Sequence, residues 1–407
     1  MSEPARIGLL GRGTVGDAFH ELVAERASAV EAASGRRPEI SGVLRRSEGD
    51  FEEILAGSDL IVELIGGLEP ARDHVLAALR AGKPVVTANK QLVARHGDEL
   101  FEAAREAGVQ LRFEAAVAGA VPVIRLVQEG LGTIALERIS GIVNGTTNFI
   151  LSEMASTGAS YEDALVRAQE LGYAEADPTE DVNGADAAAK MAILARLGFH
   201  TPVDLDDVSF EGIEGIRTDD ISYARDLGLS LKLLGIAERR GAGISVRVFP
   251  CFLYRGHPLA PVEGPFNAVT VEGPSITEIT MSGPGAGGIE TASAVLSDVV
   301  SILAGEAPVH SPGRRLEVLR DLDSSFYLHL EVADRPGVLA AIAEVLGRNG
   351  ISVKSVVQRG TGSDARLVMV THRAPEADFY AAHEEISRLD FLRAVPRAIR
   401  VVEEEFV

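Results

Sequence analysis

The feature that most constrains the fold of this chain is a regular alternation of strand-like and helix-like segments between residues 5 and 114. Short apolar runs typical of buried strands are separated by amphipathic stretches with apolar residues at helical spacing. Strands that alternate with helices require right-handed crossovers, so they predict an α/β fold with a doubly wound parallel sheet. The expected strands are 7–10, 40–44, 60–64, 84–87 and 109–113, and the expected helices include 71–81 and 91–107.

A glycine-rich turn, Gly11-Arg12-Gly13-Thr14-Val15-Gly16, follows the first expected strand and opens a helix over 14–26. Glycines at this spacing allow a tight turn, a close approach of the backbone to a pyrophosphate, and close packing of helix on strand. The motif alone is weak, but here it has the strand–turn–helix context that it needs. The alternative is a purely structural turn. We predict a Rossmann-like domain with Gly11, Gly13, Thr14, Val15 and Gly16 at a dinucleotide.

The end of the second expected strand indicates which dinucleotide is used. NAD sites usually place an Asp or Glu there for the ribose hydroxyls. This chain has Arg45, Arg46 and Ser47 instead. These side chains suit a 2′-phosphate and favour NADP(H). If the two arginines are only solvated surface charges, NAD remains possible.

The pattern changes beyond residue 130, which divides the 407-residue chain into several parts. Strands at 135–143, 244–254 and 267–272 and helices at 146–157, 160–171 and 184–198 indicate an α+β domain. The order strand, helix, two strands, helix, strand over 325–402 indicates a βαββαβ module. The expected organisation is a dinucleotide-binding domain at 1–130, a catalytic and dimerisation domain at 131–310 whose helix 289–304 could pack on either domain, a linker at 311–324, and a module at 325–407.

Composition excludes several classes of protein. A net charge of −21 argues against a nucleic acid or an anionic membrane as partner. The single cysteine, Cys251, lies in an apolar run typical of a core and permits no disulfide within the chain. We see neither a signal peptide nor an apolar run long enough for a bilayer, so we expect a cytoplasmic enzyme.

Lysine is rare in this chain, and two of the five lysines stand at informative places. Residues 172–190 place five carboxylates before Lys190, and Asp186 lies one helical turn from it. Lysine can release its proton near neutral pH in a suitable setting, whereas arginine cannot. The pair could be an ordinary surface pair, and the acids could bind a substrate ammonium or, less plausibly, a metal. Lys90 ends an expected strand, where ligands of doubly wound folds bind.

Several segments resemble the homoserine dehydrogenase family. The run from 168 to 190, AQELGYAEADPTEDVNGADAAAK, is similar to that family's signature throughout. The resemblance covers about 5–310 and includes VELIGG (62–67), VVTANK (85–90), FEAAVAGAVP (113–122), GIVNGTTNFIL (141–151) and GPGAGG (283–288).

This resemblance implies a role for individual residues. Lys190 would donate a proton, and Lys90 would assist at substrate and cofactor. The implied substrate residues are Glu175, Asp186, Asp181, Thr146 and Tyr173, and further implied cofactor contacts are Gly172, Gly285 and Gly288. The implied site for Na⁺ or K⁺ comprises Glu114 and the carbonyls of Val117, Gly119 and Val121, with a turn around one buried acid as the alternative.

Residues 325–407 resemble an ACT domain, with Asp334-Arg335-Pro336-Gly337 opening a helix. The resemblance implies feedback inhibition by threonine, with Asp334, Gly337 and Asn349 as effector residues, and a homodimer or homotetramer. The module could instead serve only oligomerisation.

The implied reaction is the NAD(P)H-dependent reduction of L-aspartate 4-semialdehyde to L-homoserine, in threonine, methionine and isoleucine biosynthesis. Two alternatives remain open. One is another oxidoreductase of a small amino-acid aldehyde. The other is an amino-acid sensor without catalysis.

Overall fold

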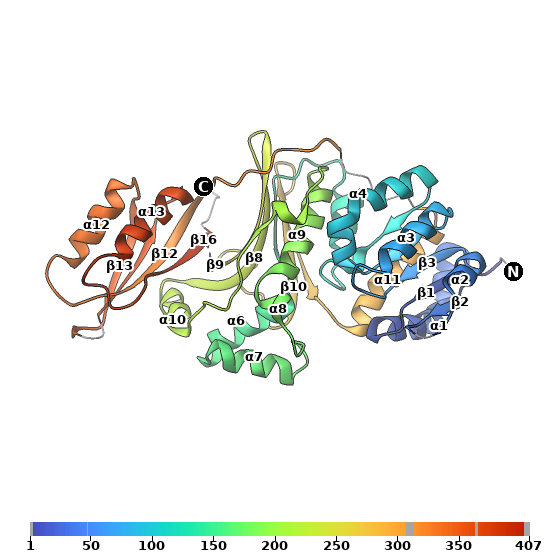
Figure 1. Cartoon of the computed structure of the whole chain (residues 1–407), viewed down its shortest axis with the longest axis horizontal. Helices are drawn as coiled ribbons and strands as arrows, with labels where there is room; N and C mark the ends of the chain where they lie inside the picture. Colours follow the sequence, from blue (N-terminus) through green and yellow to red (C-terminus); the bar gives the residue numbers. More distant parts are fainter. Residues whose placement is uncertain (1–2, 47, 307–312, 363–364, 403–407) are drawn as a thin grey trace.

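The structure is a computed structural model that describes residues 3–46, 48–306, 313–362 and 365–402. Its three parts follow one another along the longest axis, with the N-terminal domain at one end and the C-terminal module at the other (Figure 1). No helix in these ranges is long and apolar enough to cross a membrane.

The N-terminal domain contains the predicted parallel sheet. Its strand order is β2-β1-β3-β4-β5, so the chain reverses direction across the sheet beside β1. A ligand crevice is expected at the carboxyl ends of the strands at such a reversal. The elements are β1 (Ala5–Leu10), α1 (Thr14–Ser34), β2 (Pro38–Leu44), α2 (Phe51–Gly57), β3 (Leu60–Glu63), α3 (Ala71–Arg80), β4 (Val85–Thr87), α4 (Lys90–Ala107) and β5 (Leu111–Arg112).

A helix from late in the chain completes this domain. α11 (Gly288–Leu303) packs against α1, and Val295 and Val299 are buried with Phe19 in one apolar cluster. The helix of the first crossover, α1, is therefore covered by a segment from much later in the chain. α1 itself continues beyond the predicted residue 26 to Ser34, and the φ of 78° at the next residue, Gly35, suits a left-handed helix cap.

The second domain contributes strands to a sheet of eleven. Helices α6 and α9 pack against its strands, and α7 packs on α6 (Figure 1). The elements after β5 are a 3₁₀ turn (Glu114–Ala116), α5 (Val123–Arg125), a π turn (Leu126–Gly130), β6 (Arg138–Ile142), α6 (Gly145–Thr157), α7 (Tyr161–Glu170), α8 (Thr179–Val182), α9 (Ala185–Gly198), a 3₁₀ turn (Leu205–Asp207), β7 (Ser209–Phe210), α10 (Thr218–Asp226), β8 (Leu229–Arg240), β9 (Gly243–Tyr254), β10 (Phe266–Gly273) and β11 (Thr277–Pro284).

Two long strands, β8 and β11, are absent from the expected set. Most of β8 is buried on both faces, so its sequence lacks the alternation that marks a strand. β11 is an edge strand with mostly exposed residues and ends in glycine and proline, so its apolar signal is weak.

The C-terminal module confirms the predicted βαββαβ order. It contains β12 (Asp323–Glu331), α12 (Val338–Arg348), β13 (Val353–Arg359), β14 (Arg366–Thr371), β15 (Ala374–Pro375), α13 (Glu376–Ser387) and β16 (Arg397–Val402). Its apolar core, which includes Phe326, Ile342 and Phe379, is a separate cluster.

One sheet nevertheless runs through both of the last two parts. β16 pairs in parallel with β9, and Arg400 stands opposite Cys251, which is fully buried. The expected linker 311–324 begins outside the described residues. From residue 313 it lies along the second domain, where Ile244 donates to the Glu317 carbonyl and Leu319 donates to the Ile244 carbonyl. The segment is therefore packed against β9.

Candidate active site

The glycine loop has the geometry of a phosphate cradle. Gly11 has φ 100°, and a Cβ there would lie 2.4 Å from the Leu64 carbonyl oxygen. A Cβ on Gly16 would lie 2.2 Å from the Gly11 oxygen. A Cβ on Gly13 would meet no described atom within 4 Å. Two glycines are thus needed for packing, and the third leaves open space at the start of α1, where phosphates bind well.

A cavity of about 960 Å³ adjoins this loop and is large enough for much of a dinucleotide. Arg12, Arg45 and Arg46 line it. Among the described residues, the Arg45 side chain forms only a long contact of 3.4 Å, with Glu48, which also lines the cavity. Ser47 lies outside the described residues. The groups present fit the phosphates of a dinucleotide.

Two adjacent strand ends are joined so that Lys90 is fixed in place. The buried Glu63 carboxylate accepts from Thr87 Oγ1 at 2.6 Å and from two backbone N–H groups of its own loop. Burial raises the pKa of Glu63. Asn89 donates to the Gly67 carbonyl at 2.6 Å and caps α4. Lys90 is the first residue of that helix, so these hydrogen bonds of Asn89 hold the Lys90 backbone in position.

Asp186 joins the two lysines that the sequence singles out. Lys90 Nζ lies 2.5 Å from Asp186 Oδ1, and Lys190 Nζ donates to Asp186 Oδ2 at 2.7 Å and to the Val143 carbonyl at 2.8 Å. Asp186 is only 2% exposed. Burial alone would raise the pKa of its carboxyl, but the two ammonium groups outweigh burial and lower it. Burial would likewise lower the pKa of Lys90, but Asp186 outweighs burial and raises it.

Asn144 is a member of this cluster that sequence reasoning missed. Its Nδ2 donates to Asp181 Oδ1 at 2.7 Å and to Asp186 Oδ2 at 2.8 Å, while its Oδ1 caps α6. Burial and the nearby Asp186 raise the pKa of Asp181. An asparagine directly before a predicted helix is a recognisable cap, but nothing local reveals that it also bridges two acids.

The other implied substrate residues lie around this cluster and not within it. Thr146 Oγ1 donates to the Tyr173 carbonyl at 2.7 Å, and the Tyr173 ring is exposed and lies 4.9 Å from Phe149. Gly172 has φ 77°. Glu175 is exposed, and its side chain makes no hydrogen bond or ion pair with either lysine in the described chain. The structure therefore brings together Lys90, Lys190, Asp181 and Asp186, and leaves Glu175 at the surface.

The 283–288 loop connects the lysine cluster to the glycine loop. A Cβ on Gly285 would lie 2.2 Å from Asn267, whose Nδ2 donates to the same Val143 carbonyl that Lys190 contacts. Gly288 begins α11 beside Thr14 of the glycine loop. Asn267 is a second residue missed by sequence reasoning, because its partner lies more than a hundred residues away.

Comparison with known proteins agrees with this geometry. Family models described as the homoserine dehydrogenase NAD-binding domain, homoserine dehydrogenase and the ACT domain match residues 11–114, 122–300 and 327–391. Homoserine dehydrogenases of Corynebacterium glutamicum and Bacillus subtilis are 43% and 39% identical, and each alignment covers 97% of this chain and 95% and 98% of the relative. The chain belongs to the homoserine dehydrogenase family.

Solved structures of the family extend the likeness to the fold. A homoserine dehydrogenase from Thiobacillus denitrificans is 38% identical, covers 98% of both chains and superposes with a TM-score of 0.94. A hyperthermophilic archaeal homoserine dehydrogenase in complex with NADPH is 26% identical over 76% of this chain and all of that one, with a TM-score of 0.66. The chain is thus an NAD(P)-dependent oxidoreductase that converts L-aspartate 4-semialdehyde to L-homoserine in amino-acid biosynthesis.

The segment implied as a cation site is built around a buried acid. Both oxygens of Glu114 accept backbone N–H groups at 2.8 Å, from Ile124 and Arg125, and its own N–H donates to Asp298. Burial and the neighbouring Asp298 raise the pKa of Glu114 to about 7. Gly119, with φ 58°, lies directly against Gly285. Carboxylate and carbonyl oxygens are ligands that hard cations accept, so the residues present fit such an ion.

In the C-terminal module, Asp334 and Gly337 line a cavity of about 430 Å³ with Arg335 and Gln358. Asn349 does not line it. Asn349 caps the far end of α12, whose eleven residues span about 16 Å at the usual rise per residue. The three implied effector residues therefore do not form one site within a single chain.

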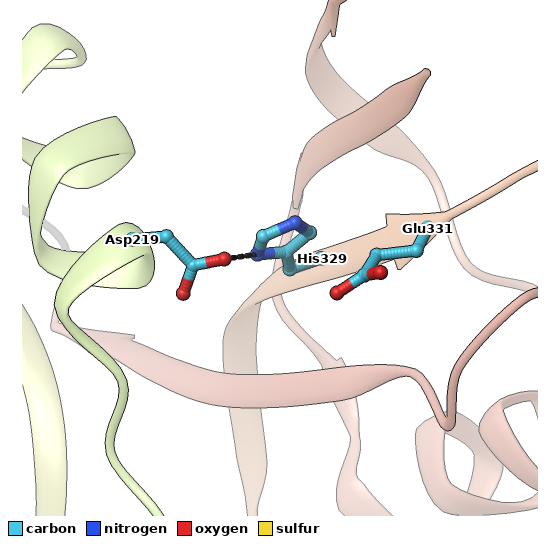
Figure 2. Close-up of side chains that lie close together, drawn as sticks. All are labelled: Asp219, His329 and Glu331. Atoms are coloured by element: carbon cyan, nitrogen blue, oxygen red, sulfur yellow. Dashed lines mark ion pairs between the residues drawn. The ribbon is translucent and has the colours of Figure 1, made fainter. Parts of the chain in front are cut away.

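A cluster where the module meets α10 of the second domain has the donor types of a metal site. Single ligand atoms of Asp219, His329 and Glu331 lie within 4.8 Å of one another, with Asp219 on α10 and the other two on β12 (Figure 2). Arg397 reaches all three, with contacts of 2.9 Å to Asp219, 2.6 Å to His329 Nδ1 and 3.4 Å to Glu331. The Arg397 guanidinium already supplies the positive charge that a metal ion would bring. The cluster is therefore a set of polar contacts that links α10 to the module.

Proposed function

We propose that the Lys90–Asp186–Lys190 cluster is the catalytic centre, with Lys190 as proton donor. The observation that carries this proposal is the buried Asp186 carboxylate between two ammonium groups, beside the Val143 carbonyl. Lys190 is 13% exposed in its side chain, so it can reach a substrate while Asp186 holds it. An ordinary surface pair would not be built around a carboxylate with 2% exposure.

The reaction then divides between the chain and its cofactor. When bound, the dinucleotide supplies the hydride that adds to the aldehyde carbon. Lys190 Nζ gives its proton to the aldehyde oxygen as negative charge develops there, and Asp186 stays ionised throughout. Lys90 stabilises charge at the same oxygen. Glu175, Asp181, Thr146 and Tyr173 bind the amino-acid part of the substrate.

The direct test is turnover of L-aspartate 4-semialdehyde, followed by loss of reduced-nicotinamide absorbance. NADPH is expected to be oxidised faster than NADH, and added threonine is expected to slow the reaction. No turnover with either dinucleotide, from folded protein that binds NADPH, would favour a different aldehyde or a sensor.

Preference for NADPH is proposed to depend on Arg45 and Arg46. The double change Arg45→Gln with Arg46→Gln is expected to lower kcat/KM for NADPH about tenfold or more, because charge-assisted hydrogen bonds to the 2′-phosphate are lost. Its kcat/KM for NADH is expected to stay unchanged. Arg105→Gln, on the exposed end of α4, is the control. An equal loss with both dinucleotides would contradict this role.

A monovalent cation is proposed to bind Glu114 and the carbonyls of Val117, Gly119 and Val121. Sodium is expected to raise the midpoint of thermal unfolding relative to tetramethylammonium at equal ionic strength, because a small cation can satisfy this acid and a large one cannot. Glu114→Gln is expected to remove the difference. An identical response of wild type and Glu114→Gln would exclude the site.

Threonine is proposed as the effector at Asp334 and Gly337. Asp334→Ala is expected to raise the threonine concentration for half-inhibition about tenfold, because the ammonium loses its carboxylate. Glu384→Ala, at an exposed position of α13, should leave inhibition unchanged. If threonine changes neither activity nor thermal stability of the wild type, the module serves only oligomerisation.

A homodimer or homotetramer in the cytoplasm is also proposed. It is supported by the edge position of β11 and β13 and by exposed Val356 on β13. Light scattering that gave the mass of one 43.0 kDa chain would exclude the assembly, and fractionation of cells would test the location.

A further inference from the structure

A small cavity lies where the C-terminal module joins the catalytic sheet, away from both lysines. It measures about 50 Å³ and is bordered by residues of β6, β8, β9, β12 and β16. This volume exceeds the share of one water in the liquid, about 30 Å³, and is far below that of a site for a drug-sized molecule. Any occupant is therefore small.

Five arginines line this cavity, which is unusual for so small a space. Glu238 forms ion pairs with three of them, at 3.1 Å with Arg138, 3.0 Å with Arg240 and 3.2 Å with Arg247. Glu376, which does not line the cavity, forms ion pairs with Arg247 and Arg400. Two further acids outside the lining form ion pairs with these arginines, Glu211 with Arg400 and Glu272 with Arg138. Besides Glu238, the described lining contains one other acid, Asp323, which is exposed. The five arginines are Arg138, Arg240, Arg247, Arg373 and Arg400.

Three polar atoms of the lining have no hydrogen-bond partner among the described residues. They are Nε of Arg240, Nε of Arg247 and Oγ of Ser325. Ser325 is 1% exposed, and the Arg247 side chain is 11% exposed. Buried donors without an acceptor cost free energy, so a bound acceptor would be stabilised here.

We propose that this cavity binds a small inorganic oxyanion of the phosphate or sulfate type. Guanidinium groups match such oxygens in geometry and charge, and the hydroxyl of Ser325 adds a neutral donor. The lining comes from both sides of the β9–β16 pairing, with Arg240 and Arg247 on the catalytic sheet and Ser325 and Arg400 on the module. A bound oxyanion therefore holds the module to the catalytic sheet.

The test uses the full chain with NADPH at saturation, so that the nucleotide site is blocked. Thermal unfolding and calorimetry are measured with sodium phosphate or sodium sulfate against sodium chloride, at equal sodium and ionic strength. The wild type should show a saturable rise in midpoint and measurable binding. Arg240→Gln, at a partly exposed strand end, and Ser325→Ala should each weaken binding about tenfold or more.

Arg239→Gln is the matched control, because Arg239 is the preceding residue of β8, does not line the cavity and lies over Phe199. It should bind phosphate as the wild type does. Ser325→Ala removes an atom without a partner, so it is expected to fold normally. A response to phosphate that does not saturate, or that is the same in wild type, Arg240→Gln and Ser325→Ala, would show that the cavity holds only water and overturn the proposal.

Discussion

Lys190→Ala is expected to lower kcat by about 10²–10⁴-fold, the usual contribution of a positioned general acid. The proton for the developing alkoxide would then have to come from water, while binding of NADPH should change little because Lys190 is not part of the glycine loop. Steady-state kinetics with L-aspartate 4-semialdehyde, and titration of NADPH by fluorescence, measure the two effects separately.

Lys190→Arg separates the loss of the proton donor from the loss of positive charge. Arginine preserves the charge beside Asp186 but does not release its proton near neutral pH, so most turnover should still be lost. Lys354→Arg, on strand β13 of the C-terminal module, is the matched control and should retain full activity. Near-normal turnover in Lys190→Ala would mean that another group supplies the proton.

Asp186→Asn is expected to be the most damaging single change to stability as well as to activity. It leaves Lys90 and Lys190 without their shared carboxylate, at a position that is 2% exposed. Removing one member of a buried ion pair costs about 3–5 kcal/mol, and the loss here should be near the lower value because Lys90 is 34% exposed. Urea unfolding gives the free energy, and kcat should fall with it because Lys190 loses its anchor.

The effect of Asp186→Asn should also depend on pH. The two lysines lower the pKa of Asp186 below its ordinary 3.8, so near that value the folded state binds fewer protons than the unfolded state. Stabilisation by this carboxyl is therefore complete at neutral pH and is lost as the pH falls below about 4. Wild type and Asp186→Asn should converge in acid. Glu170→Gln, which removes an exposed pair with Arg167, should cost little at any pH. A constant difference between wild type and Asp186→Asn from neutral pH to acid would contradict this assignment.

Local features were strong predictors where one short segment contains the whole signal. The three glycines of residues 11–16 require a strand before them and a helix after them, and the structure has β1 and α1 there. Asp186 and Lys190 meet because an α-helix brings residues four apart onto one face. The βαββαβ order of the module was also readable, since its strands and helices are short and regularly punctuated.

Features that depend on distant segments were not readable. The pairing of β9 with β16 joins residues 251 and 400, and no local pattern specifies which edge strand another strand will meet. Most of β8 is buried on both faces, so its sequence lacks the alternation of apolar and polar residues that predicts a strand. Glu175, a carboxylate implied to hold substrate, lies exposed and apart from the lysines, whereas Asn144 joins Asp181 to Asp186.

The sequence by itself determined the dinucleotide loop, the fold classes of the domains and the lysine–aspartate pair on α9, because each is set by spacing within a few helical turns or strand residues. Only the tertiary structure decided that Lys90 shares Asp186 with Lys190, that Asn144 and Asn267 complete the cluster, and that five arginines converge where the module joins the catalytic sheet. The physical reason is that such contacts form when separate elements pack. Their free energy comes from burial and charge pairing across the fold, which spacing along the chain does not encode.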